Sequence, residues 1–186
     1  MKKLLWVCFA LLLLAGCAGD SSGMERALEI RSSLLKAEQV AFHVQITADY
    51  TERAYQFEMD CASDEEGNLR FTVTAPEGIA GVCGVISAGS GQLTFEGMRL
   101  DFGLMAENRI SPISGPWLCL NSLRGGYIVS CGDMGDSFHM VIDESYEEDT
   151  LTTEVWTDSD GVVSTAEISW KGMRVLTLVF SDFKTE

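Results

Sequence analysis

Apolar and polar residues alternate through most of the chain beyond about residue 40. Over residues 42–47, Phe, Val and Ile alternate with His, Gln and Thr, and the same period of two recurs over 55–61 and 69–73. This alternation predicts antiparallel strands with one face in the core and the other in water. Further short strands are expected at 81–87, 92–97, 98–103, 127–131, 137–146, 151–156, 162–170 and 174–180.

Turn residues indicate how consecutive strands connect. Residues 64–68, with the sequence DEEGN, predict a turn between the second and third strands. Glu96-Gly97 and Lys171-Gly172 each lie between apolar alternations, and a glycine there adopts positive φ at little cost. Both dipeptides therefore predict tight hairpins.

Helical spacing replaces the alternation in two places. Apolar residues at positions 27, 30, 34 and 37 predict a helix over about residues 23–38. Ser22 precedes Glu25 by three residues, which is the spacing of a capping box at a helix start.

A second helix is expected within residues 111–126, the segment SPISGPWLCLNSLRGG. Ser111 or Ser114 is a candidate cap, a proline at 112 or 116 suits the first turn, and Gly125-Gly126 ends the helix.

This order of elements predicts an α+β fold. A long antiparallel meander must bury one face, and a curved sheet leaves a hollow side that helices cover. We therefore expect a curved antiparallel sheet, an incomplete β-barrel, wrapped around two helices. No interior segment is rich in proline or serine, so residues 24–186 are expected to form a single domain.

The first residues predict export from the cytoplasm. Lys2 and Lys3 precede an apolar run over residues 4–14, which is too short to span a bilayer as a helix. The run ends in Leu14-Ala15-Gly16-Cys17, which resembles the lipobox of bacterial lipoproteins. The resemblance implies a signal peptide over residues 1–16, lipidation of Cys17, and a flexible tether over 17–23. The folded part is then expected on the extracytoplasmic face of the cell membrane, held by its acyl chains.

The charge of the chain restricts its partners. The formal net charge is −15, and removal of residues 1–16 with their two lysines leaves 11 basic and 28 acidic side chains, or −17. So acidic a chain argues against nucleic acid as a partner, because phosphate binding depends on Lys and Arg. Electrostatic adhesion to an anionic bilayer is disfavoured for the same reason, so the acyl anchor is expected to hold the protein on the membrane.

The whole pattern resembles the LolA/LolB-like fold. The resemblance rests on the lipobox, on the helix-first meander, and on the segment VTAPEGIAGV, which leads to RISPISGPW. That fold is shared by lipoprotein carriers, by mycobacterial lipid-carrying lipoproteins and by a clostridial germination lipoprotein. The resemblance covers roughly residues 24–184 and implies an incomplete β-barrel closed by helices. It transfers no functional residue, because no position-specific motif is present.

Four cysteines besides Cys17 belong to the expected folded part. An exported protein can oxidise them, and pairing of neighbours along the chain predicts the disulfides Cys61–Cys83 and Cys119–Cys131. The alternative is four thiols that act as small buried hydrophobic groups.

The sequence shows no constellation typical of an enzyme or a metalloprotein. His43 and His139 lie in predicted strands beside no ligand-spaced partner, and no Gly-x-Ser-x-Gly motif is present. The segment 158–161 resembles part of a calcium loop, but Trp156 would occupy the first ligand position, so a turn is expected. The acidic runs 64–66 and 147–149 are interpreted as solvated turns. We therefore expect no catalytic activity, no cofactor and no bound metal.

The apolar residues indicate one function. Seven large side chains are candidates to line a cavity for an acyl chain, and the alternative is that they fill an ordinary core: Trp117, Leu120, Leu123, Phe57, Phe71, Phe95 and Phe102. Two functions stay open on this basis. In the first, the domain binds a lipid or acyl chain at the membrane surface. In the second, it is a tethered adaptor that contacts an envelope or spore-cortex enzyme and holds no ligand.

Overall fold

The computed structural model describes residues 21–50, 53–106, 109–147 and 150–186. The expected signal peptide, Cys17 and residues 18–20 of the expected tether lie outside this part of the chain. Helix α2 (Ser21–Lys36) begins the described structure and is followed by β1 (Gln39–Asp49). Among the described residues, no helix has both the length and the apolar character needed to cross a bilayer.

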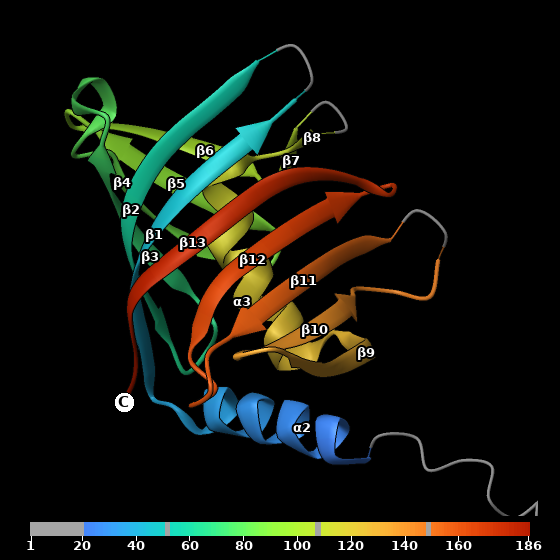
Figure 1. Ribbon diagram of the computed structural model, residues 1–186. Coiled ribbons are helices and arrows are strands. Elements are labelled where there is room, and N and C mark those ends of the chain that lie inside the picture. The colour runs from blue at the N-terminus through green and yellow to red at the C-terminus, as the bar shows by residue number, and fades with distance from the viewer. Residues whose placement is uncertain (1–20, 51–52, 107–108, 148–149) are drawn as a thin grey trace, which may run out of the picture.

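Eleven strands form one antiparallel sheet in the order β6-β5-β4-β3-β2-β1-β13-β12-β11-β10-β9 (Figure 1). Each half of the sheet is a meander of consecutive strands, and the two halves meet where β1 pairs with β13. The remaining strands are β2 (Ala54–Asp64), β3 (Leu69–Ala75), β4 (Cys83–Ser87), β5 (Ser90–Phe95), β6 (Met98–Gly103), β9 (Tyr127–Met134), β10 (Ser137–Asp143), β11 (Leu151–Thr157), β12 (Val163–Trp170) and β13 (Met173–Thr185).

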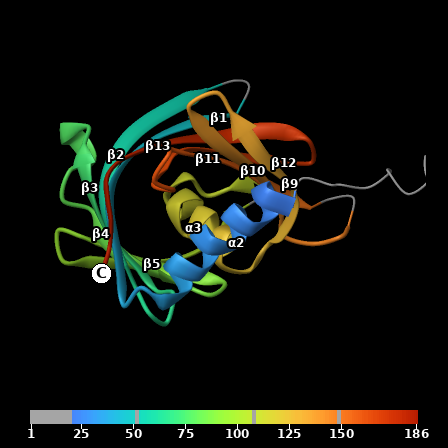
Figure 2. The ribbon, with the colours of Figure 1, turned by 60° about the horizontal axis from the view of Figure 1, so that its bottom comes forward.

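The sheet curves around helix α3 (Gly115–Gly125), and α2 lies across one end of the curve (Figure 2). Register shifts interrupt several pairings, among them β2 with β3 and β11 with β12, and such bulges increase twist and bend the sheet. Two short 3-10 turns complete this part of the fold. Turn η1 (Glu77–Ile79) follows β3, and turn η2 (Pro112–Ser114) precedes α3. Strands β7 (Met105–Ala106) and β8 (Arg109–Ile110) form a separate two-stranded ribbon.

The predicted alternation is confirmed on the inner strands. Val44 and Ile46 of β1 are fully buried, and Leu69, Phe71 and Val73 of β3 are also buried. Tyr55 departs from the pattern, because its side chain is 47% exposed although it shares its face with buried Phe57. Tyr55 lies near the start of β2, where no helix covers the sheet.

Both predicted hairpins are confirmed. Glu96 and Gly97 have φ values of 48° and 80°, and Lys171 and Gly172 have values of 52° and 73°. Two consecutive residues with positive φ match the twist of the flanking strands. The predicted turn over residues 64–68 also joins β2 to β3, with Gly67 at a φ of 82°.

The helices are present but their predicted starts need correction. Helix α2 begins at Ser21, so Ser22 lies inside the first turn and is not the cap. Ser114 occupies the N-cap position of α3, yet its hydroxyl donates to the Ser111 carbonyl at 2.6 Å instead of capping the helix. The 3-10 turn that precedes α3 is the reason, since it brings the Ser111 carbonyl within reach of this hydroxyl.

Candidate functional site

An apolar hollow opens at the end of the curved sheet that lies away from α2. Its volume is about 650 Å³, within the range of small-molecule sites. None of the described residues that line it carries a charge. We call it the apolar hollow; its main apolar lining is Tyr55, Phe57, Val73, Leu93, Phe95 and Ile113.

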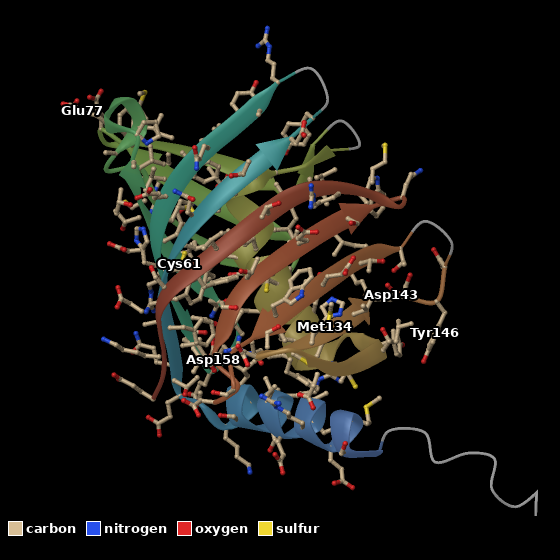
Figure 3. All side chains as sticks on the ribbon, in the orientation of Figure 1. Cys61, Glu77, Met134, Asp143, Tyr146 and Asp158 are labelled. Atoms are coloured by element: carbon tan, nitrogen blue, oxygen red, sulfur yellow. The ribbon has the colours of Figure 1, made fainter. Side chains whose placement is uncertain are left out.

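The hollow exists because the two halves of the sheet are covered unequally. Helix α3 packs against α2 and, among the strands, against β10, β12 and β13 of the C-terminal meander. Of the described residues that line the hollow, none belongs to α2 or α3, so the inner faces of β2, β3 and β5 have no helix over them there. Instead η1 and η2 form the sides, through Ile79 and Ile113 respectively. Figure 3 shows Glu77 of η1 at this end and Asp158 close to α2 at the other.

Burial changes from the floor of the hollow to its rim. Phe57 and Val73 are 8% and 2% exposed and belong to the main core, whereas Tyr55 and Ile79 are 47% and 42% exposed. The Tyr50 hydroxyl donates to the carbonyl of Ile110, which ties β1 to the segment before η2. The hollow is therefore a continuation of the hydrophobic core that solvent can reach.

The seven predicted cavity residues are divided between the hollow and the packed interior. Phe57 and Phe95 line the hollow. Phe71 and Leu123 are buried in the core at 3% and 2% exposure. Phe102 packs on Gly91, where an added Cβ would lie 2.2 Å from the Phe102 ring.

Trp117 and Leu120 lie away from the hollow. Both line a smaller pocket of about 170 Å³ between α3, the C-terminal turn of α2 and the β2–β3 turn. The Trp117 indole N–H donates to the carbonyl of Gly67 at 2.9 Å, and its side chain is 9% exposed. Trp117 thus packs beside α2 and does not reach the hollow.

Sequence reasoning missed most of the hollow. Pro76, Ile79 and Val82 come from the segment VTAPEGIAGV, and Pro112 and Ile113 come from SPISGPW. The first segment supported only the fold resemblance, and the second was also predicted to begin a helix, but neither was predicted to line a cavity. Their irregular backbone gives no periodic signal, so the alternation pattern could not assign their side chains to the inner face.

The opposite end of the sheet is closed by α2 through two arginines. Arg31 donates to the carbonyls of Leu123 and Gly126, both at 2.7 Å. These carbonyls lie at the C-terminus of α3, where unpaired acceptors and the helix dipole favour a cation. Burial lowers the pKa of Arg31, but a guanidinium stays charged at neutral pH.

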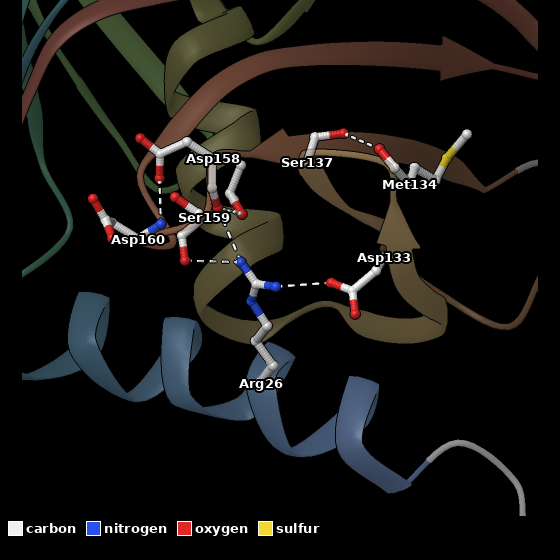
Figure 4. A network of polar contacts seen from close by, with 8 residues as sticks. Arg26, Asp133, Met134, Ser137, Asp158, Ser159 and Asp160 are labelled. Carbon is white, nitrogen blue, oxygen red and sulfur yellow. Dashed lines mark hydrogen bonds and ion pairs between the residues drawn. The ribbon is translucent and has the colours of Figure 1, made fainter.

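Arg26 holds the N-terminal part of α2 against strand β9 and the β11–β12 turn (Figure 4). Its guanidinium donates to Asp133 at 2.8 Å and to the carbonyls of Asp158 and Ser159 at 3.1 Å. It also lies 4.7 Å from the centre of the Phe138 ring. One side chain thereby joins α2 to β9 and to the β11–β12 turn.

Cys61, Cys83 and Cys119 are free thiols in the structure, so neither of the expected disulfides, Cys61–Cys83 and Cys119–Cys131, is formed. The expected Cys61–Cys83 pair is not formed, because Cys61 lies opposite Phe71 of β3, whereas Cys83 lies opposite Thr72. Strand β3 separates the two, and their side chains are on opposite faces of the sheet. Cys119 is buried in α3 with its pKa raised to about 12 by burial, and Cys131 is a half-buried thiol of β9.

The two histidines, the acidic turn 64–66 and the turn at Asp158 lie outside the hollow, whereas residues 148 and 149 of the acidic run 147–149 are not among the described residues. The His43 ring contacts Asp60 at 2.8 Å, and the His139 ring contacts Glu154 at 3.1 Å while it stacks on Trp156. The Asp158 carboxylate accepts from the amides of Asp160 and Val162, as in an ordinary turn. Within the described residues, no three acidic, histidine or cysteine side chains gather as a metal site would require.

No family model matches the chain, and no curated protein is significantly similar to it in sequence. A DUF1329 family protein from Desulfovibrio piger has a similar solved structure, with 6% identity and a TM-score of 0.50 over 89% of this chain and 92% of that one. The fold predicted from the sequence is confirmed.

Two further solved structures are similar at lower TM-scores. A LolA superfamily protein from Nitrosomonas europaea is 10% identical and covers 86% of this chain and 93% of its own, with a TM-score of 0.44. A structure of the Clostridioides difficile CwlD amidase in complex with the GerS lipoprotein is 9% identical over 88% of this chain and 95% of that one, with a TM-score of 0.44. At identities of 6–10% these similarities concern the fold alone.

Proposed function

We propose that this protein is an extracytoplasmic lipoprotein that binds one acyl chain or similar apolar chain in the apolar hollow. The observation that carries the proposal is the apolar hollow itself. It has a volume of about 650 Å³, opens from the core at one end of the sheet, and is lined by uncharged residues. Solvent in such a hollow is displaced favourably by hydrocarbon, because burial contributes about 0.8 kcal/mol for each CH₂ group.

The character of the lining selects the kind of ligand. Gln56 and Ser111 are the only described lining residues whose side chains are polar and not aromatic. A ligand with one long apolar part and a head group left at the rim suits this distribution. A charged or sugar-like molecule would lose its hydration without finding matched partners.

The expected anchor places this hollow at a membrane surface. The lipobox ending in Cys17 implies acyl chains on the thiol, and two or three such chains hold a protein on a bilayer. We expect Cys17→Ala to release the protein from membranes or to leave it as an unprocessed precursor. Fractionation of cells and mass measurement of the product test this, and normal cleavage with unchanged membrane retention would contradict it.

The ligand is tested by extraction from the full-length chain. We expect mass spectrometry to find close to one apolar molecule for each protein in the purified sample. In Ile113→Trp a larger side chain enters the hollow from η2, so the amount or the chain length of the ligand should fall. Val179→Trp is the matched control, because Val179 is 46% exposed and lies on strand β13, outside the lining of the hollow.

The adaptor function is the other outcome of this experiment. It is favoured if the native chain carries no lipid and an envelope protein is recovered by crosslinking. Lipid that is retained equally by Ile113→Trp and Val179→Trp would instead contradict the hollow as the binding site.

A further inference from the structure

The two edges of the sheet differ in how they are protected. Strand β9 ends one edge, contacts α2, and has a register shift opposite Val141 and Ile142. Bulges and covering elements are common ways to prevent a sheet edge from pairing with another chain. Strand β6 ends the other edge and pairs with β5 in an unbroken register from Met98 to Gly103.

The inner face of β6 is apolar and unusually exposed. Met98 and Leu100 are 67% and 59% exposed, although their neighbours across β5 are Phe95 and Leu93. The other face of the strand carries Arg99 and Asp101, so the edge combines an apolar side with one charge of each sign.

Hydrogen-bond geometry determines which residues can pair at this edge. Phe95 and Met98 flank the two-residue turn, so they exchange backbone hydrogen bonds, and so does every second pair along the hairpin. The backbone groups of Leu100 therefore point to β5. Those of Arg99 and Asp101 point to the open edge and are available to an added strand.

One register of self-pairing satisfies both backbone and side chains. We propose that two copies of this chain associate through an antiparallel β6–β6 pair whose two-fold axis passes through Leu100. Arg99 of one copy then lies opposite Asp101 of the second copy, twice, as a hydrogen-bonded pair. Leu100 lies opposite Leu100, and Met98 lies opposite Phe102, so apolar residues meet on the inner face.

Neighbouring registers are less suitable. Centring the axis on Arg99 places two arginines opposite each other, and centring it on Asp101 does the same for two aspartates; like charges at opposite positions are destabilising. A shift by a single residue would pair the apolar face with the charged face. The charges at this edge thus favour one isologous dimer, and this inference does not depend on a ligand in the hollow.

Cysteine crosslinking in the full-length, detergent-purified chain tests the register. In a background with exposed Cys83 changed to Ser, Leu100→Cys should give a covalent dimer on oxidation, because opposite Cα atoms in this kind of pair are about 4.5 Å apart. Met98→Cys is the matched control. It is equally exposed, but its counterpart in the second copy would be displaced by four residues, or roughly 13 Å.

Charge exchange gives a second, independent readout. In the Leu100→Cys chain, Arg99→Asp or Asp101→Arg alone should reduce crosslinking roughly 5-fold or more, since both cross-strand pairs become like charges. The double variant R99D/D101R restores opposite charges and should recover the dimer. Equal crosslinking of Leu100→Cys and Met98→Cys would overturn the proposal, and so would a double variant that is no better than either single one.

Discussion

The two ends of the curved sheet are covered in different ways. At the closed end, where α2 lies across the sheet, Arg26 and Arg31 make five hydrogen bonds to the C-terminal end of α3, to β9 and to the β11–β12 turn. At the open end the inner faces of β2, β3 and β5 surround the apolar hollow together with Tyr50, η1 and η2, and no described helical residue of α2 or α3 lines it. Hydrogen bonds from two arginines therefore hold one end in place. The other end is apolar and unfilled, as the proposed binding of an apolar ligand requires.

The largest loss of stability is expected when packing is removed at the closed end. Trp117→Ala removes a buried indole and its hydrogen bond to Gly67, and we expect the free energy of unfolding to fall by about 3–5 kcal/mol. Urea denaturation measures the loss. Trp117→Phe keeps most of the apolar contact and should lose far less, and a similar small loss for both variants would show that Trp117 is loosely packed.

Loss of the polar contacts at the closed end is expected to cost less than loss of Trp117. Arg31→Met keeps much of the side-chain volume but leaves the carbonyls of Leu123 and Gly126 without their charged donor. We expect destabilisation of about 1.5–3 kcal/mol, as for hydrogen bonds to a charged group. Lys36→Met, in the last turn of the same helix, is the control for loss of one positive charge. Equal unfolding free energies for the two variants would contradict the role of Arg31 as a clamp.

The same change, phenylalanine to alanine, compares packing in the core with packing at the wall of the hollow. Phe71→Ala, in the core, should cost about 3–5 kcal/mol. Phe95→Ala, at the partly exposed wall of the hollow, should cost only about 1 kcal/mol, because solvent already contacts part of its ring. The same Phe95 variant should lower the amount of co-purified lipid. Equal stability losses at both positions would mean that the hollow is packed as tightly as the core.

Labelling of the native thiols involves the smallest change in stability. It tests directly which face of the sheet a cysteine side chain occupies. Cys83 should react with a maleimide in the native protein, whereas Cys61 and Cys119 should react only after unfolding. Burial blocks access to both of these thiols and raises the pKa of each, which lowers the reactive thiolate population. Peptide mapping after labelling distinguishes the sites, and a Cys61–Cys83 disulfide in the native chain would contradict the strand arrangement.

The thiols also show why the order of residues along the chain was a poor guide to pairing. Cys61 and Cys83 are neighbours among the cysteines, but the parity of their positions in β2 and β4 puts them on opposite faces. The hollow illustrates the same limit. Phe57 and Phe95 were predicted to line a cavity together with Trp117 and Leu120, yet α3 carries the latter two toward α2.

The sequence by itself determined what depends on near neighbours. The period of two assigned Val44, Ile46 and Phe71 to the core face, and Glu96-Gly97 specified a tight hairpin, because side-chain direction and turn geometry are set within a few residues. Tertiary structure decided the pairing of β1 with β13, which joins segments at opposite ends of the described chain. That pairing curves the sheet into a shape that one helix covers only in part, so the position of the hollow follows from long-range contacts that no local pattern encodes.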